Sequence, residues 1–270
     1  ANLALWDEWT DIHEKSALYD VSSFLSHREN RLKPPELEAL PDVAGKSLLH
    51  LQCHFGIDTL SWAMRGAQVT GADFSPKAVR LARRLAGELH LDARFIEGNL
   101  YDLPAIIDEQ FDIVFTSYGV LCWLPDIPRW AEIAARFVKP GGTFFIAEFH
   151  PAAGVFDDER EDELFVPRYP YFPHDQPLEF RGEGSYAGTH EGEDRESRMR
   201  TSYEWSYSLG QVVTALIHAG LRIEELREYP YTVFNPFDKL VQECDDGLFR
   251  WRDERVDLPL MFSVKAAKEK

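Results

Sequence analysis

Residues 47–73, SLLHLQCHFGIDTLSWAMRGAQVTGAD, contain a complete strand–helix–strand unit. Two short apolar or β-branched runs, 47–51 and 68–73, flank a helical pattern at 57–66. This order is typical of a βαβ unit, in which a crossover helix joins two parallel strands. The stretch therefore predicts a parallel sheet, and it places the turn HLQCHFGID (50–58) at the edge of the sheet where ligands bind.

The same alternation continues along the chain. Ser75, followed by Pro76, predicts the start of a second helix, because serine caps helix N-termini and proline suits the first helical position. The predicted strands are 47–51, 68–73, 93–98, 111–116, 143–149, 221–229 and 258–266. The predicted helices of this region are 57–66, 75–89, 126–138 and 208–220. Together they predict an α/β fold with a Rossmann-like, doubly wound, mostly parallel seven-stranded sheet.

Composition divides the chain into three regions. These are an N-terminal helical cover (1–46), a core (47–150 plus 208–270) and an inserted β/loop lid (151–207). Helical patterns at about 2–15 and 21–30 form the cover. The insertion is rich in Pro, Tyr, Phe, Gly and acidic residues and has no helical period, which predicts strands and loops laid over the core.

Bulk composition limits the classes of partner. The 270-residue chain is 44% hydrophobic, and no apolar run approaches the roughly 20 residues that span a membrane. A net charge of −17 repels phosphate backbones and argues against a nucleic-acid partner. Three scattered cysteines and an N-terminus without the pattern of a signal peptide predict a cytoplasmic protein.

The oligomeric state stays open between a monomer and a homodimer. The aromatic residues of the insertion suit either a substrate wall or a dimer surface. They are Tyr169, Tyr171, Phe172 and Tyr186.

Polar residues follow each of the first four predicted strands, and the carboxyl ends of parallel strands share one edge of a sheet. Asp73 ends the second strand 17 residues after Gly56, near the spacing at which an acidic side chain binds ribose hydroxyls. Asn99 follows the third strand, and either Asn99 or Asp102 can pair with an adenine amino group. Ser117 and the residues after it follow the fourth strand. The pattern predicts a nucleoside-binding edge.

This order of strand ends resembles class I S-adenosylmethionine (SAM)-dependent methyltransferases, over about 47–148 and 208–266. In that family the first loop has an acidic residue followed by glycines at alternate positions. The corresponding positions here are His50, Gln52, His54 and Gly56, so only the last glycine is kept. The string LLHLQCHFGIDTLSWAMRGAQVTGADFSPKA is similar to an uncharacterised bacterial subgroup in which Gln-Cys-His-Phe-Gly replaces the glycine-rich loop.

The resemblance implies a methyltransferase that uses SAM, releases S-adenosylhomocysteine (SAH) and methylates a small-molecule acceptor. The cofactor-binding residues that it implies lie at the strand ends and in the N-terminal cover, which would act as a lid. They are Trp6, Trp9, His13, His50, Gln52, His54, Gly56, Asp73, Phe74, Asn99, Leu100, Ser117 and Tyr118. For the N-terminal residues the alternative is simple packing of a helix on the core.

Methyl transfer from a sulfonium is an in-line displacement, so alignment of the acceptor supplies most of the catalysis. Where a proton must be removed, we expect Glu148 or His150, at the end of the fifth strand, to accept it. Tyr118 is expected to line the path of the methyl group. Gly56 is expected to approach the methionine part of SAM, so that Gly56→Val would block binding.

Four other hypotheses remain in view. Cys53 with His54 could form a nucleophile and its base. Alternatively, His50, Cys53 and His54 could bind a metal together with His174 or His190. Adjacent side chains at a strand end point in different directions, which argues against both hypotheses. An NAD-dependent oxidoreductase would need the glycine-rich turn that this chain lacks. A non-catalytic SAM-binding or nucleoside-binding protein would tolerate the altered first loop. Because the side chains of the first loop point apart, we predict no metal site.

Overall fold

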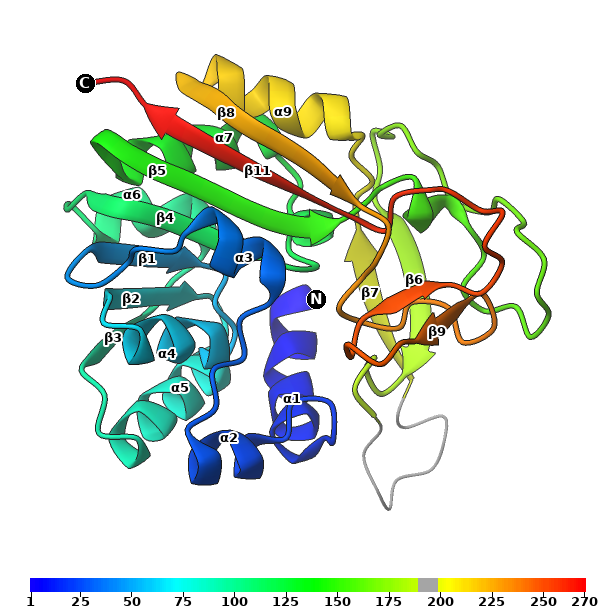
Figure 1. Ribbon diagram of the computed structural model, residues 1–270, viewed down its shortest axis with the longest axis horizontal. Helices are drawn as coiled ribbons and strands as arrows, with labels where there is room; N and C mark the ends of the chain where they lie inside the picture. Colours follow the sequence, from blue (N-terminus) through cyan, green and yellow to red (C-terminus); the bar gives the residue numbers. More distant parts are fainter. Residues whose placement is uncertain (189–198) are drawn as a thin grey trace.

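A seven-stranded sheet forms the centre of the protein in the computed structural model, which describes residues 1–188 and 199–270 (Figure 1). The strand order is β3-β2-β1-β4-β5-β11-β8. The strands are β1 (Ser47–Leu51), β2 (Gln68–Asp73), β3 (Ala93–Glu97), β4 (Phe111–Ser117), β5 (Val138–Phe149), β8 (Leu221–Tyr229) and β11 (Met261–Lys268). The first five are parallel, and β11 runs antiparallel to both β5 and β8. The predicted doubly wound, mostly parallel sheet is confirmed.

Helices cover both faces of this sheet. On one face lie α3 (Pro34–Ala39), α4 (Ile57–Met64) and α5 (Pro76–Glu88), and on the other lie α7 (Ile127–Phe137) and α9 (Leu209–His218), with the short α6 (Leu103–Ile106) beside β4. Leu48 and Leu49 are both fully buried although successive strand residues point to opposite faces. A sheet buried on both sides explains why its strands appear in the sequence as continuous apolar runs.

Most predicted elements are confirmed, and the differences fall in short segments. The predicted helix at 21–30 ends earlier, as α2 (Val21–His27), because Arg28 takes a left-handed conformation with φ 52°. The sequence predicted no helix at the position of the six-residue α3. The final strand begins at Met261 rather than at 258.

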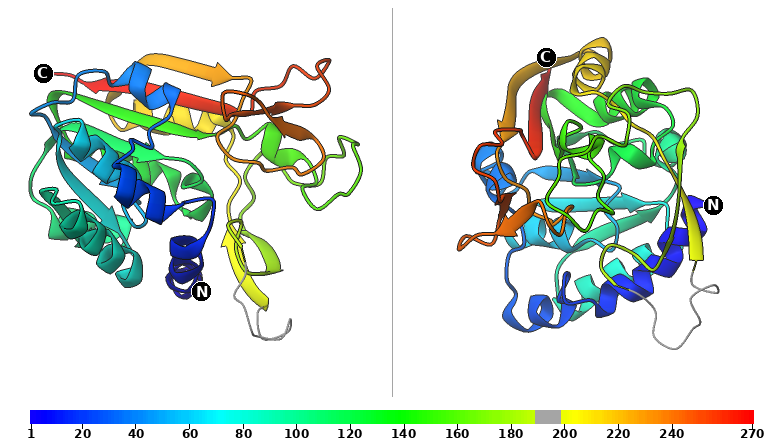
Figure 2. Two further views of the ribbon diagram at one scale, coloured as in Figure 1. Left: turned by 60° about the horizontal axis from the view of Figure 1, so that its bottom comes forward. Right: turned by 90° about the vertical axis from the view of Figure 1, so that its right-hand side faces the viewer.

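Two small hairpins lie beyond the carboxyl ends of the parallel strands (Figures 1 and 2). Strands β6 (Leu178–Glu183) and β7 (Met199–Glu204) pair antiparallel within the insertion, which begins with the 3₁₀ turn η3 (Ala153–Val155). Strands β9 (Val241–Glu243) and β10 (Phe249–Trp251) form a second hairpin between β8 and β11, which the sequence did not predict.

The N-terminal helix α1 (Asn2–Lys15) spans the gap between the first hairpin and the core. On the hairpin side, Asn2 Nδ2 donates to Tyr203 O at 2.8 Å. On the core side, Asp7 Oδ1 accepts hydrogen bonds from Ser75 Oγ at 2.6 Å and from Lys77 N at 3.1 Å, at the start of α5. Helix α1 thus lies across the edge of the sheet where the ligand is expected.

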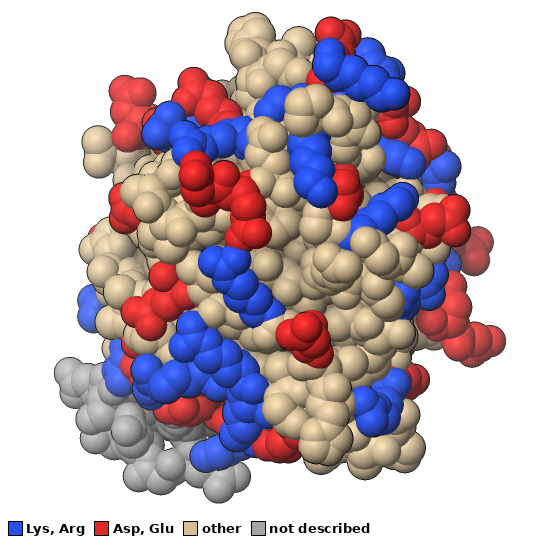
Figure 3. Space-filling model, turned by 90° about the vertical axis from the view of Figure 1, so that its left-hand side faces the viewer, with Lys and Arg blue, Asp and Glu red and all other residues tan. Residues whose placement is uncertain are grey.

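The opposite end of the molecule, at the amino ends of the parallel strands, carries acidic and basic side chains interspersed (Figure 3). In the described part of the chain no helix is long and apolar enough to cross a membrane.

The turn between β1 and α4 depends on Gly56. Its φ is +80°, and a Cβ at this position would lie 2.6 Å from Phe95 Cε1 and 3.2 Å from Ala82 Cβ. Any side chain at position 56 would therefore collide with Phe95 on β3 and crowd Ala82. Packing against Phe95 is thus a reason for glycine that the sequence did not reveal, and the expected approach of Gly56 to the methionine part of SAM stays a prediction.

We predict that Gly56→Ala lowers the free energy of unfolding more than Gly45→Ala does. Gly45 also has a positive φ of +75°, but a Cβ there meets nothing within 4 Å, so its replacement costs only the left-handed strain of about 1–2 kcal/mol. Overlap with Phe95 adds a further ~1–3 kcal/mol at Gly56. Urea unfolding of both variants measures the difference, and equal losses would contradict the packing argument.

Candidate active site

A cavity of about 1030 Å³ lies at the carboxyl edge of the parallel strands, at the upper end of the size range of small-molecule sites. Its walls come from the ends of β1 to β4, from α1, from the β6–β7 hairpin and from the loop after β8. Most of the predicted site residues line it: Trp6, Trp9, His50, Gln52, His54, Gly56, Asp73, Phe74, Asn99, Leu100, Ser117 and Tyr118. Three predicted site residues, His13, Glu148 and His150, are not part of its wall.

The first loop keeps the backbone of a glycine-rich loop although two of its glycines are replaced. The φ angles are 56° at Gln52, 50° at His54 and 80° at Gly56, so alternate residues are left-handed. Left-handed conformations cost an L-residue roughly 1–2 kcal/mol, and such strain persists where surrounding contacts enforce it. Here Gln52 Nε2 donates to Val120 O at 3.1 Å, and His54 Nε2 lies 2.8 Å from His13 Nδ1.

Asp73 joins this loop to the end of β2. Its Oδ2 accepts from His54 N at 2.8 Å and its Oδ1 from Ser75 N at 2.9 Å. Burial raises the pKa of this carboxyl to about 6, against the lowering effect of those N–H donors. Each oxygen keeps a second lone pair, so Asp73 can hold the loop and still accept hydrogen bonds from a ligand.

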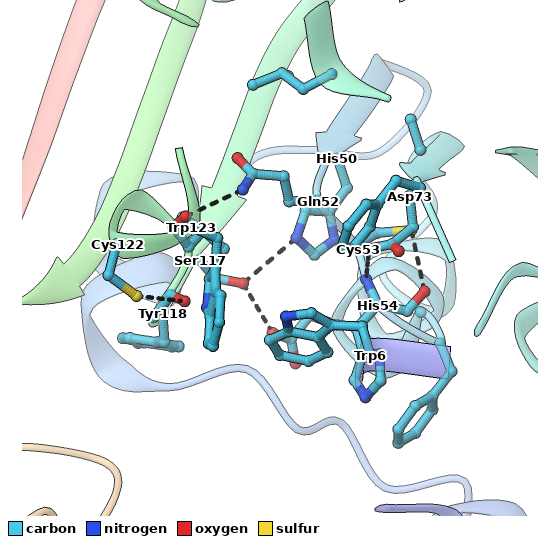
Figure 4. Close-up of a pocket in the computed structure, with 18 of the residues that line it drawn as sticks. Trp6, His50, Gln52, Cys53, His54, Asp73, Ser117, Tyr118, Cys122 and Trp123 are labelled. Carbon is cyan, nitrogen blue, oxygen red and sulfur yellow. Dashed lines mark hydrogen bonds between the residues drawn. The ribbon is translucent and has the colours of Figure 1, made fainter. Parts of the chain in front are cut away.

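His50, Ser117 and Asp58 form a polar chain on the cavity wall, and Figure 4 shows the first two. His50 Nδ1 lies 2.8 Å from Thr59 Oγ1, and its Nε2 lies 3.4 Å from Ser117 Oγ. Ser117 Oγ donates to Asp58 Oδ2 at 3.1 Å. Burial lowers the pKa of His50 to about 3, which keeps the imidazole neutral. Asp58 is a site residue that the sequence analysis missed, although it belongs to HLQCHFGID.

Two basic residues on the cavity wall were also not predicted from the sequence. Arg31 and Lys33 lie between α2 and α3 and reach the cavity. Among the described residues, neither Nε nor Nη2 of Arg31 has a hydrogen-bond partner, and Glu29 Oε2 is 3.7 Å from Nη2. The segment between the two helices carries no motif that would have identified them.

Several buried polar atoms of the cavity wall lack hydrogen-bond partners within the described ranges. They are Gln52 Oε1, His54 Nδ1 and Trp6 Nε1. Most buried polar groups in proteins are paired, so an unpaired group calls for an explanation such as a ligand. In this part of the site the Trp6 ring lies beside the rings of His54 and Trp123 (Figure 4). The donor and acceptor set fits a polar ligand such as SAM.

Glu148 does not face the cavity, which corrects its predicted role as a proton acceptor. Its carboxylate accepts hydrogen bonds from four backbone N–H groups in the turn after β4 and at the end of β5. The donors are Gly119 at 2.5 Å, Val120 at 2.8 Å, Leu121 at 3.2 Å and Phe149 at 2.7 Å. Glu148 therefore shapes the loop that carries Tyr118.

His150 is also placed away from the cavity. Its Nδ1 accepts from Ala152 N at 3.1 Å, and its Nε2 lies 2.9 Å from Oε1 of Glu228 on β8. Of the three residues predicted to act in catalysis, only Tyr118 lines the cavity.

His13 supports the site from behind the first loop. Its ring is fully buried, with Nδ1 against His54 and Nε2 3.0 Å from Ser185 Oγ in the insertion. Burial lowers the pKa values of His13 and His54, so both rings are neutral near pH 7.

The thiol and metal hypotheses receive no support from the geometry. Cys53 is only 4% exposed, and burial raises the pKa of its thiol well above the usual value. The rings of His50 and His54 bond to different partners, Thr59 and His13. No group of three His, Cys, Asp or Glu side chains in the described residues is arranged to hold a metal, and His190 lies outside them.

Residues 49–146 match the family model described as a methyltransferase domain. A ubiquinone biosynthesis O-methyltransferase from Chromobacterium violaceum is 32% identical over 132 residues, which are 48% of this chain and 56% of that protein. A demethylmenaquinone methyltransferase from Clavibacter sepedonicus is 33% identical over 139 residues, covering 50% and 55%. The chain spans about half the length of the curated relatives that it matches.

Solved structures share the fold over most of the chain. A SAM-dependent methyltransferase from Mesorhizobium loti superposes with a TM-score of 0.55 at 20% identity, covering 87% of this chain and 96% of that one. The glycopeptide N-methyltransferase MtfA complexed with SAM gives 0.55 at 16% identity, covering 87% and 86%. The comparisons therefore confirm the fold and a methyltransferase domain over residues 49–146, and the Gln-Cys-His-Phe-Gly subgroup stays a prediction.

We predict that Glu148→Ala lowers the free energy of unfolding by about 3 kcal/mol or more, because it leaves several buried N–H groups unpaired at roughly 1–3 kcal/mol each. Glu179→Ala, which removes an exposed carboxylate on β6, is the matched control and should change the free energy of unfolding by less than about 0.5 kcal/mol. Urea unfolding measures both. A loss at Glu148 no larger than that of the control would show that the turn does not depend on this carboxylate.

Proposed function

We propose that this protein is a methyltransferase that transfers the methyl group of SAM to a small-molecule acceptor and releases SAH. The observation that carries the proposal is the first loop: three alternate left-handed residues follow β1 within the matched methyltransferase domain, and the middle one, His54, donates its backbone N–H to Asp73. That geometry presents a ligand with the backbone of a glycine-rich loop.

The cofactor is assigned to the strand ends. Asp73 is the acceptor for the ribose hydroxyls, and Phe74, Asn99 and Leu100 border the adenine. The unpaired atoms Gln52 Oε1, His54 Nδ1 and Trp6 Nε1 supply polar contacts along the rest of the ligand. His13 acts through His54 by fixing the orientation of its ring.

Asp58 supplies the acidic group that position 50 no longer provides. His50 is neutral, whereas the Asp58 carboxylate lines the cavity and is held by Ser117. We assign the ammonium group of SAM to Asp58, and its carboxylate to Arg31 and Lys33, which line the same cavity.

The bound cofactor supplies an electrophilic methyl group, and the residues of this chain hold the acceptor in line with it and exclude water. Helix α1 forms the cover, with Trp6 and Trp9 on the cavity wall. Tyr118 is the one predicted catalytic residue that remains beside the acceptor path. We also propose that the protein acts in the cytoplasm on small molecules and not on nucleic acid, which its net charge of −17 supports.

Isothermal titration calorimetry with SAM, SAH and 5′-methylthioadenosine tests the proposal. We expect all three to bind to the unmodified protein. Asp58→Asn should weaken SAM binding about tenfold or more, as expected when a charged hydrogen bond is lost, and should leave 5′-methylthioadenosine unchanged because it lacks the amino-acid part.

Asp108→Asn, at an exposed position in the loop before β4, is the control with the same loss of charge and should bind all three ligands normally. No binding of SAM or SAH at millimolar concentration would reject the proposed function. Equal weakening of all three ligands by Asp58→Asn would reject only the assignment of Asp58.

A further inference from the structure

Glu204, the last residue of β7, places a carboxylate on the cavity wall without a cationic partner. Ser202 Oγ donates to Glu204 Oε1 at 3.0 Å. No lysine or arginine in the described ranges lies within ion-pair distance of it. Burial raises the pKa of this carboxyl, and a carboxylate held this way gains most from a ligand that brings a positive charge.

Four aromatic rings line the same cavity as this carboxylate. Trp6 and Trp9 come from α1, Trp123 from the 3₁₀ turn η2 (Leu121–Trp123) and Tyr186 from the β6–β7 connection. The Trp6–Trp123 centroids are 5.2 Å apart at 84°, and the Trp9–Tyr186 centroids are 6.0 Å apart at 84°. Neighbouring rings are nearly perpendicular, so the wall presents aromatic faces in more than one direction. Such faces attract cations.

We infer that the methyl acceptor is a small amine whose cationic nitrogen binds against Trp6, Trp9, Trp123 and Tyr186, with Glu204 as its counter-ion. This inference rests on the proposed function and names the substrate class of the same cavity. The basic residues of the cavity, Arg31 and Lys33, are already assigned to the carboxylate of SAM.

Other acceptor classes fit this wall less well. An anionic acceptor would face the charge of Glu204, and a neutral aromatic acceptor would use the rings but leave the half-buried carboxylate without a cation. A cationic amine satisfies both the rings and the carboxylate.

Methylation of such an acceptor conserves protons and electron pairs. The protonated amine gives its proton to the Glu204 carboxylate, and the nitrogen lone pair then forms the new N–C bond. The S–C bond of SAM breaks with its electron pair going to sulfur, which yields neutral SAH. The methylated nitrogen is again positively charged, and Glu204 releases its proton to solvent.

The test uses protein saturated with SAH, whose sulfur is neutral, so that the cofactor brings no sulfonium to the wall. Calorimetry compares choline with its uncharged isostere 3,3-dimethyl-1-butanol. We expect choline to bind at least tenfold more tightly than the alcohol. Choline is permanently charged, so its affinity should rise with pH as Glu204 ionises.

Glu204→Gln should reduce choline affinity at least tenfold, abolish this pH dependence and leave the alcohol unaffected. Glu179→Gln removes the same charge from an exposed position on the same hairpin and should bind choline normally. Trp123→Leu tests the aromatic wall separately and should weaken choline binding even if Glu204→Gln does not fold.

Equal affinities for choline and the alcohol, or unchanged choline binding in both Glu204→Gln and Trp123→Leu, would overturn the inference. Either result leaves the proposed function intact as long as SAH binds. Loss of SAH binding itself would instead reject the proposed function, and choline titration of the ligand-free protein would still report on the cation site.

Discussion

The hydrogen bond from the His54 backbone N–H to the Asp73 carboxylate, 2.8 Å long, holds the site together. It joins the turn after β1 to the end of β2 at the point where the ligand is expected. A second bond between the same segments, from Cys53 N to Ala72 O at 3.0 Å, fixes the register of the turn. With both bonds formed, the left-handed conformations of Gln52 and His54 are enforced by their surroundings, and glycine is no longer needed there. Only Gly56, packed on Phe95, has kept a steric requirement for glycine.

The sheet was predictable from the sequence because its strands are buried on both faces. Runs such as 47–51 and 68–73 have no solvent face, and they match β1 and β2 residue for residue. Helix α3 and the β9–β10 hairpin could not be predicted in this way. Both are short, and they form because they pack on other parts of the chain rather than because of a strong local pattern.

The candidate site was predictable where it depends on strand ends and unpredictable where it depends on side-chain direction. Glu148 and His150 are at the correct edge of the sheet, but Glu148 turns towards backbone N–H groups and His150 towards Glu228. Arg31, Asp58 and Glu204 reach the cavity from three distant segments, and only the fold brings them together. A spacing of residues along one strand contains no information about such partners.

A crystal structure of the protein with SAH bound tests the central claim most directly, namely that this altered loop still builds a SAM site. We expect ribose hydroxyls within hydrogen-bond distance of Asp73, with φ still positive at Gln52 and His54. SAH bound elsewhere, or a first loop rebuilt with negative φ at both residues, would contradict it.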